Sequence, residues 1–318
     1  MNKNNTISNN SIPTNSVSTN SFAIKSFAKV NLGLQVLNKR PDGFHNINTI
    51  FSRINLFDEI EITPNNTNEI SLIVKNNDEL NTPENLKDNL IVKAFFKIQN
   101  KIIKSKSDLK IGIDVKLTKN IPIGAGLGGG SSNAATIITQ LQKIFNLKLS
   151  DGELQIIAQS IGSDVPYFLK DGMAVAKSRG EKLKYFTHNL GYKLFLINPK
   201  IHISTPWAYG ELNREVFESI NQKQNIYEEI NFYQILMQSK NNDTLLRSYL
   251  INDFEKAIFG KYPEIQNIKK NLYDMGAVFS LMSGSGSTVF GLFKDNSEFE
   301  NIKKYYQTQY SNYFIFHD

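Results

Sequence analysis

One glycine-rich stretch constrains this chain more than any other part of it. In IPIGAGLGGGSSNAATIITQL, residues 121–141, five glycines precede two serines and an apolar pattern with helical spacing. Glycine permits positive φ and close approach to the main chain, and a helix start attracts anions. The stretch therefore predicts a polyphosphate site. The alternative is a tightly packed loop in which Ser131 or Ser132 only caps the helix.

The known phosphate-loop patterns do not match this stretch well. GAGLGG satisfies G-x-G-x-x-G, but Asn120 and Pro122 separate it from a buried strand, and no acidic strand end follows. A Walker loop requires G-K-[ST], and protein kinases carry H-R-D; both are missing. The segment thus lacks a lysine of its own, and we expect the cation from elsewhere in the chain.

Composition excludes several other classes of protein. The chain has 318 residues, 40% hydrophobic and 21% charged, which indicates a globular protein of about two domains. Its net charge is +6, and the seven lysines from Lys97 to Lys119 have Asp108 and Asp114 among them and no aromatic residue between them, which favours a solvated surface over a nucleic-acid groove. Cysteine is absent, and the four histidines lack metal-ligand spacing. No run of about 18 apolar residues predicts a membrane span, and we expect a cytoplasmic protein.

The pattern along the chain predicts a mixture of strands and helices. Residues 1–21 are rich in Asn, Ser and Thr, and we expect a disordered tail rather than a targeting signal. From Phe22 the residues alternate, which places Lys29 and Asn31 about 7 Å apart on the polar face of a strand. Further strands are predicted in DEIEITP, EISLIVK, KIGIDVKL, MAVAKSRGEKLKYF and KLFLINP, and two more in GAVFSLMSGSGSTVFGLF.

Helices are predicted between these strands. They cover DNLIVKAFFKIQNKI, the residues after the glycines, and much of 206–272. Ser150 and Glu153 form a capping box for another helix, which Gly162 ends. Because strands and helices mix without a strict βαβ rhythm, the predicted fold class is α+β.

Several of these stretches resemble the GHMP kinase superfamily. PIGAGLGGGSSNAA resembles its second motif and LMSGSGSTVFGLF its third. FAKVNLGLQVLNKRPDGFHNINTIF, with a D-G-F-H turn after the strand, is similar to the branch that acts on 4-diphosphocytidyl-2-C-methyl-D-erythritol. DNLIVKA, GSDVPYFL and ISTPWAY follow in the order expected for that branch, so the resemblance covers about residues 24–318.

The resemblance implies a fold and an activity. The fold is the two-domain α+β arrangement of GHMP kinases, with an N-terminal domain at 22–175, a C-terminal domain at 176–318 and the active site in the cleft between them. The activity is phosphorylation of the substrate's 2-hydroxyl by MgATP, a step of the non-mevalonate route to isoprenoid precursors. We expect neither nucleic acid nor a membrane as a partner, and we expect the chain to be a monomer or a weak homodimer.

The resemblance also implies roles for residues at the phosphoryl-transfer site. Asp164 would accept the hydroxyl proton, whereas Lys29 would lower the pKa of that hydroxyl and stabilise developing charge. The alternatives are a turn or helix cap for Asp164 and an ordinary exposed lysine for Lys29. ATP phosphates would be held along the segment, with Asn89 as a further nucleotide contact; Mg²⁺ would need no dedicated protein ligands. The segment residues are Pro122, Gly124, Ala125, Gly126, Leu127, Gly128, Gly129, Gly130, Ser131 and Ser132.

At the cytidine end, the resemblance assigns aromatic and polar contacts. Phe44 and Tyr209 would sandwich the base, and His45 would hydrogen-bond its edge. Asn31 and Thr205 complete the expected substrate-binding set. The alternative for the aromatic residues is a place in the core. Phe44 stands where the family commonly has Tyr, which preserves stacking but not a phenolic hydrogen bond. Phe27 replaces a usual Pro, and Ala125 a frequent Gly.

Three other functions stay open at this point. They are a GHMP kinase for a different alcohol, a GHMP-fold sensor that binds nucleotide without turnover, and a Rossmann-type oxidoreductase. The D-G-F-H turn argues against a kinase for a different alcohol, and the presence of both Lys29 and Asp164 argues against a sensor. Nicotinamide binding would indicate an oxidoreductase.

Overall fold

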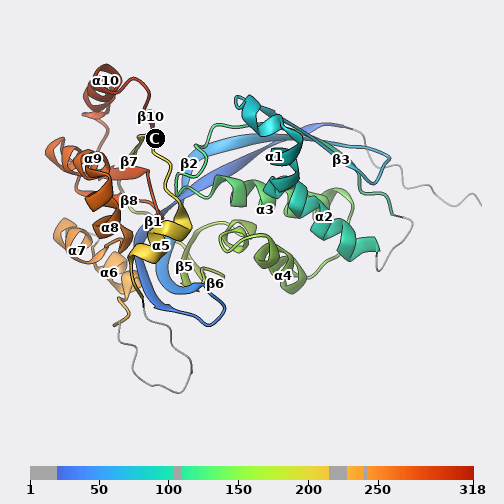
Figure 1. The fold of residues 1–318 in the computed structure, drawn as a ribbon, viewed down its shortest axis with the longest axis horizontal. Coiled ribbons are helices and arrows are strands. Elements are labelled where there is room, and N and C mark those ends of the chain that lie inside the picture. The colour runs from blue at the N-terminus through green and yellow to red at the C-terminus, as the bar shows by residue number, and fades with distance from the viewer. Residues whose placement is uncertain (1–19, 104–108, 215–227, 240–241) are drawn as a thin grey trace, which may run out of the picture.

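The computed structural model describes residues 20–103, 109–214, 228–239 and 242–318, so most of the expected tail lies outside the described residues. Its elements form two sheets with helices packed against them (Figure 1). The strands are β1 (Phe22–Lys39), β2 (His45–Pro64), β3 (Ile70–Lys75), β4 (Ile113–Thr118), β5 (Met173–Ser178), β6 (Lys182–Phe186), β7 (Lys193–Asn198), β8 (Phe279–Met282), β9 (Val289–Phe293) and β10 (Phe314–His317).

Helices connect and cover these strands. The α-helices are α1 (Pro83–Asp88), α2 (Leu90–Ile103), α3 (Gly129–Ile144), α4 (Asp151–Ile161), α5 (Thr205–Glu211), α6 (Phe232–Gln238), α7 (Asp243–Tyr249), α8 (Phe254–Lys261), α9 (Pro263–Asp274) and α10 (Phe299–Gln309). Two 3₁₀ helices are η1 (Asp78–Asn81) and η2 (Val165–Leu169). No helix in the described ranges is long and apolar enough to span a bilayer.

The first half of the chain is built on a six-stranded sheet. Its order is β3-β4-β2-β5-β6, and β1 pairs with β2 as a long antiparallel hairpin. Helices α2, α3 and α4 bury their apolar sides against it, which confirms the helical pattern expected after the glycines. The capping box of Ser150 and Glu153 is also present at the start of α4, and Gly162 is the C-cap of that helix.

The second half contains a four-stranded sheet of order β10-β7-β9-β8. Helices α8, α9 and α10 contribute to the core against it, with Phe195, Ile258, Ile268 and Ile302 fully or almost fully buried. In Figure 1 these helices lie on the side of the molecule opposite α2 and α4. The two strands predicted around the second Gly/Ser sequence are β8 and β9, so that prediction is confirmed.

The boundary between the two domains is expected at residue 175. That position lies inside β5, which pairs with β2 and with β6 in the first sheet. We therefore propose that the first domain continues to Phe186 and that the chain crosses to the second sheet before β7. The alternation in MAVAKSRGEKLKYF predicts a strand, but it carries no information about which sheet the strand joins.

Strand β1 departs from the expected half-exposed strand. Lys29 and Asn31 are only 4% and 2% exposed, and their apolar neighbours are buried as well. Gly33, with φ of +83°, lies where the pairing with β2 shifts register, so the strand bends there. The interpretation of Lys29 as an exposed lysine is wrong, because the second half of the chain packs against this face; the N–H of Asn31 donates to Ser283 Oγ.

Candidate active site

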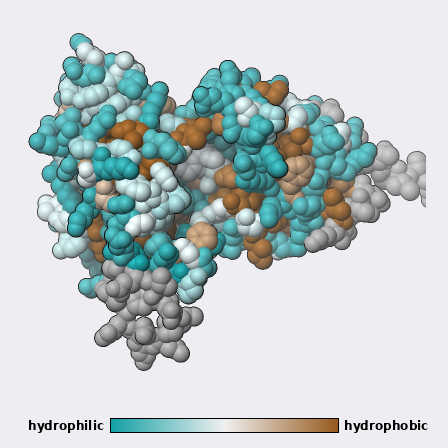
Figure 2. Space-filling model, in the orientation of Figure 1, coloured by the Kyte–Doolittle hydropathy of each residue, from teal (hydrophilic) through white to brown (hydrophobic). Residues whose placement is uncertain are grey.

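A cleft of about 940 Å³ lies between the two halves of the molecule. Figure 2 shows the two lobes, covered mostly by hydrophilic residues, meeting at a notch. Both halves line the cleft, and the lining includes every residue expected at the catalytic and substrate-binding positions. These are Lys29, Asn31, Phe44, His45, Asp164, Thr205 and Tyr209.

The glycine-rich segment, residues 122–132, borders this cleft with a backbone that requires glycine. Gly124, Gly126 and Gly128 line the cleft and have φ of +64°, +77° and +68°. A Cβ at Gly126 would lie 2.1 Å from the carbonyl oxygen of Ser283. Glycine is therefore needed at position 126 partly because the loop at 283–288 packs onto the segment there. The two Gly/Ser motifs, distant in sequence, meet at one place.

Helix α3 begins directly from this segment without a side-chain cap. Gly128 is its N-cap, in the left-handed conformation. The alternative that Ser131 or Ser132 caps the helix is therefore wrong. Ser132 is buried, and its Oγ accepts a hydrogen bond from Ser26 Oγ at 2.7 Å. The remaining segment residues do not line the cleft; these are Pro122, Ile123, Ala125, Leu127, Gly129, Gly130, Ser131 and Ser132.

Lys29 and Asp164 form an ion pair beside the glycine-rich segment. Nζ of Lys29 lies 3.4 Å from Oδ2 of Asp164 and donates to the carbonyl oxygen of Gly126 at 3.1 Å. Asp164 is 31% exposed, so its carboxylate reaches the cleft, while the ammonium lies beneath it. Asp164 precedes η2 but makes no side-chain capping bond, so the capping interpretation is wrong. Lys29 thus brings an ammonium group from β1 beside a segment that has no lysine of its own.

Asn31 is held in one orientation by its neighbours. Its Oδ1 accepts from Lys29 Nζ at 2.8 Å, and its Nδ2 donates to Thr49 Oγ1 at 2.9 Å. Thr49 in turn donates to the carbonyl oxygen of Gly33. Thr49 was not predicted as part of the site, because its position opposite β1 depends on the strand register.

The aromatic residues at the substrate end have protein partners in this structure. The rings of His45 and Tyr209 stack with centroids 4.8 Å apart and an angle of 20° between planes. Phe44 is 48% exposed, and the guanidinium of Arg179 lies 4.3 Å from its ring centroid. Burial, and then the charges of Lys39 and Arg214, lower the pKa of His45, which favours its neutral form at pH 7. Burial and the charge of Asp164 raise the pKa of Tyr209.

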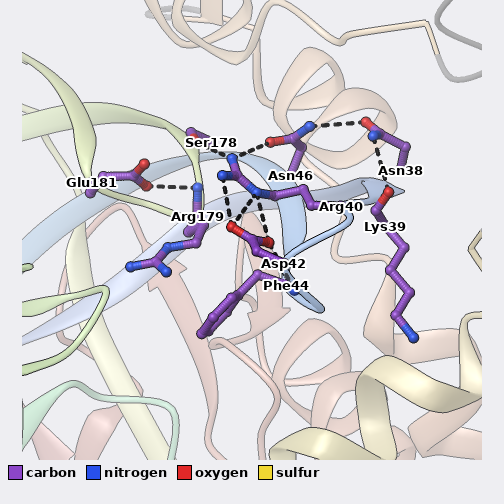
Figure 3. A network of polar contacts seen from close by, with 9 residues as sticks. All are labelled: Asn38, Lys39, Arg40, Asp42, Phe44, Asn46, Ser178, Arg179 and Glu181. Atoms are coloured by element: carbon purple, nitrogen blue, oxygen red, sulfur yellow. Dashed lines mark hydrogen bonds and ion pairs between the residues drawn. The ribbon is translucent and has the colours of Figure 1, made fainter. Parts of the chain in front are cut away.

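The turn that carries Phe44 is attached to the end of β5 by Arg40. Its guanidinium donates to Asp42 within the turn, to Asn46 Oδ1 at 3.2 Å, and to Ser178 Oγ at 2.8 Å (Figure 3). Ser178 adopts a φ of +63°. Arg40 therefore joins two segments from different strands and brings Phe44 and Arg179 together.

The charges in the cleft favour an anionic ligand. Among the described residues, four cationic side chains line it, namely Lys29, Lys39, Arg179 and Arg214. Asp164 is the one carboxylate among the lining residues that the structure describes. Lys39 lies within the stretch FAKVNLGLQVLNKRPDGFHNINTIF and Arg179 within MAVAKSRGEKLKYF, but no site role is predicted for either from the sequence, and only the structure places them in the cleft.

Asn89 and Thr205 occupy different parts of the molecule. Asn89 is not among the cleft-lining residues; its Oδ1 accepts from the N–H of Ile91 at 3.0 Å, at the start of α2. Its neighbour Leu90 lies near Gly130, so Asn89 is close to the start of α3. Thr205 Oγ1 lies 3.0 Å from Ser285 Oγ, which connects α5 to the loop at 283–288.

Comparison with known proteins agrees with this arrangement. Residues 89–172 match the model of the GHMP kinases N terminal domain, and residues 231–312 match that of the GHMP kinases C terminal domain. The chain is 38% identical over 287 residues, 88% of its length, to the 4-diphosphocytidyl-2-C-methyl-D-erythritol kinase of Thermodesulfovibrio yellowstonii, covering 92% of that protein. It is 39% identical over 268 residues to the enzyme of the same name from Caldanaerobacter subterraneus subsp. tengcongensis, covering 84% of this chain and 86% of that protein.

Solved structures show the same fold. A crystal structure of 4-(cytidine 5'-diphospho)-2C-methyl-D-erythritol kinase matches with a TM-score of 0.71 and 26% identity, covering 93% of this chain and 98% of that one. The mevalonate kinase of Methanococcus jannaschii matches with a TM-score of 0.63 and 17% identity, over 96% and 98% of the two chains. The chain belongs to the GHMP kinases, and it is a small-molecule kinase. Within that superfamily, it is a member of the 4-diphosphocytidyl-2-C-methyl-D-erythritol kinase family.

Proposed function

We propose that this chain transfers the γ-phosphoryl group of ATP to the 2-hydroxyl of 4-diphosphocytidyl-2-C-methyl-D-erythritol, in the non-mevalonate route to isoprenoid precursors. The observation that carries the proposal is the Lys29–Asp164 pair directly beside the glycine-rich segment. Phosphoryl transfer depends mainly on positioning and on neutralising charge, and these residues are suited to both tasks.

The glycine-rich segment and the start of α3 bind the ATP phosphates in this proposal. Gly124, Gly126 and Gly128 line a cleft whose charged lining residues are Lys or Arg except for Asp164, and the backbone N–H groups of this segment would bind the phosphates. Asn89 near the start of α3 is the proposed further nucleotide contact. The uncapped helix start leaves amide donors available for an anion.

Mg²⁺ fits this site as a partner of the nucleotide. Among the described residues, no group of three or more His, Cys, Asp or Glu side chains is placed to hold a metal ion. Mg²⁺ keeps several waters and takes phosphate oxygens, so it would need no dedicated protein ligand beside bound ATP, where it would supply neutralisation of the phosphate charge. Asp164, the carboxylate that lines the cleft, is left to act on the acceptor alcohol.

Asp164 is the proposed base for the acceptor alcohol. Its carboxylate takes the proton of the 2-hydroxyl as the oxygen of that hydroxyl forms its bond to the γ-phosphorus. The bond from the γ-phosphorus to the bridging oxygen breaks, and ADP leaves with the electron pair. Lys29, held by Asn31 and Gly126, stabilises the negative charge on the reacting oxygens.

The cationic and aromatic side chains bind the rest of the substrate in this proposal. Lys39 and Arg179 are suited to the diphosphate, and Phe44, His45 and Tyr209 to the cytosine base. Neutral His45 offers both a hydrogen-bond donor and an acceptor to the edge of the base. Thr205 and Asn31 complete the contacts around the alcohol end.

The test is detection of product by mass spectrometry. We expect a single added phosphate on 4-diphosphocytidyl-2-C-methyl-D-erythritol after incubation with ATP and Mg²⁺, and none when Mg²⁺ is removed by EDTA. Product from a different alcohol alone would indicate another GHMP kinase, and ATP binding without ADP formation would indicate a sensor. A cytoplasmic location and a monomer or weak homodimer also belong to the proposal. Sedimentation analysis tests the second of these.

A further inference from the structure

Asp58 is a fully buried carboxylate that the reaction proposed above does not use. It lies in β2, has 0% exposure, and is not among the residues lining the cleft. A buried carboxylate requires several hydrogen bonds to remain ionised. The partners of Asp58 all come from the residues on either side of the glycine-rich segment.

One set of partners immediately precedes the segment. Oδ1 of Asp58 accepts from the backbone N–H groups of Asn120 and Ile121, both at 2.8 Å. Lys119 Nζ donates to the two carboxylate oxygens at 3.1 and 2.8 Å, and also to the carbonyl oxygen of Ile121. Asn120 Nδ2 donates to the carbonyl oxygen of Phe57 at 3.1 Å. Residues 119–121 are therefore fastened to β2.

The other partner immediately follows the segment. Asn133, in the first turns of α3, is buried, and its Nδ2 donates to Oδ2 of Asp58 at 2.9 Å. One carboxylate thus connects residue 121 with residue 133. Residues 122–132, which contain all the glycines of the motif, span the interval between these two attachments.

We propose that Asp58 is the positioning residue of the glycine-rich segment: it sets the separation of the two ends and so the direction of the backbone N–H groups between them. The inference rests on the proposed function, because it takes this segment to bind the ATP phosphates. The charge matters as well as the shape. Asp58 receives hydrogen bonds from four groups, whereas an asparagine has one acceptor oxygen and would turn an NH₂ group toward other donors.

A purely structural role for Asp58 predicts a different result from a positioning role. Loss of a buried ion pair lowers stability in either case. Only the positioning role raises KM for ATP much more than KM for the other substrate, since the proposed function assigns the segment to the ATP phosphates. Three variants separate these cases: Asp58→Asn, Asn133→Ala, and Ile98→Ala as the control. Ile98 is fully buried in α2, so its truncation lowers stability without removing any attachment of the segment.

The experiment combines steady-state kinetics with hydrogen exchange of the full chain. For Asp58→Asn and, more weakly, for Asn133→Ala, we expect KM for ATP to rise by about tenfold or more. KM for the cytidine substrate should change by less than about threefold. Amides 124–130 should exchange faster in the ligand-free protein. Ile98→Ala should change none of these quantities.

An unchanged KM for ATP together with unchanged exchange at 124–130 in folded Asp58→Asn overturns the inference. So does an equal rise of both KM values. If Asp58→Asn does not fold, two other variants are judged by the same criteria. One is the double variant Asp58→Asn with Lys119→Met, which removes both charges, and the other is Asn133→Ala. An inactive wild-type chain would overturn the proposed function, while the exchange measurement would still test the attachment.

Discussion

The ammonium of Lys29 lies 3.4 Å from the carboxylate of Asp164, although the two residues come from different elements of the first half of the chain. Lys29 belongs to β1, and Asp164 precedes η2. Because Lys29 also donates to the carbonyl oxygen of Gly126, the pair is attached to the glycine-rich segment. Three stretches that are separate in sequence therefore form one arrangement suited to phosphoryl transfer.

Replacement of Asp164 by Asn should remove turnover and leave ATP binding. Asparagine keeps the size of the side chain but cannot accept a proton, so we expect kcat to fall by about 10²- to 10⁴-fold. Steady-state kinetics and calorimetric titration with ATP measure the two effects. Asp171→Asn is the control, because Asp171 is exposed and pairs with Arg53 outside the cleft. A kcat within tenfold of wild type would exclude Asp164 as the base.

Lys29 and Asp164 should act as a unit. Lys29→Met should lower kcat by a similar factor, because Asp164 loses its partner and the reacting oxygens lose a cation. We expect the double variant to lose about as much as the more affected single variant, since groups that act together are not additive. A double-mutant cycle on kcat measures this coupling. If the loss of kcat in the double variant equals the product of the two single losses, the two residues act independently.

The effect of alanine should differ between two glycines of the same segment. Both Gly124 and Gly126 have positive φ, which costs alanine about 1 kcal/mol or more. A Cβ at Gly126 also meets the carbonyl oxygen of Ser283, whereas at Gly124 the nearest atom is 3.6 Å away, in His202. Gly126→Ala should therefore lower Tm more than Gly124→Ala does. Equal shifts in thermal denaturation would contradict the packing of the two Gly/Ser loops.

Arg40 should affect the cytidine substrate and not ATP. Arg40→Ala removes the attachment of the turn at 40–44 to Ser178, so Phe44 and His45 lose their fixed position. We expect KM for the cytidine substrate to rise by about tenfold, with KM for ATP unchanged. Arg53→Ala, which removes a partly exposed arginine outside the cleft, is the matched control. An equal rise in KM for ATP would show that the substitution disturbs the whole cleft and not only the cytidine end.

His45 should titrate below the ordinary range of histidine. Burial and two nearby cations lower its pKa, so the folded state resists protonation. The unfolded chain takes up this proton near pH 6.5. The stability associated with neutral His45 is therefore complete above that pH and is lost as pH falls toward the lower folded pKa. An NMR titration should place the midpoint below 6.5, and His45→Gln should reduce the loss of stability on acidification. A midpoint above 6.5 would contradict the prediction.

The parts of the fold that depend on neighbouring residues could be predicted from the sequence. The helix after the glycines, the capping box of Ser150 and Glu153, and the strands around the second Gly/Ser loop follow from local periodicity and capping. Lys29, Asp164 and the D-G-F-H turn were recognised because they belong to short motifs. For these features, a few adjacent residues contain the relevant physical information.

Other features became visible only with the folded chain. The membership of β5 in the first sheet, the burial of Lys29, and the contacts of Thr49 and Arg179 depend on strand register and on packing of the two halves. The attachment of Asp58 to Asn133 is of the same kind. Each of these features joins residues far apart in the chain, and many weak contacts together set the relative position of those residues. The pattern of neighbouring residues in the sequence does not determine these contacts.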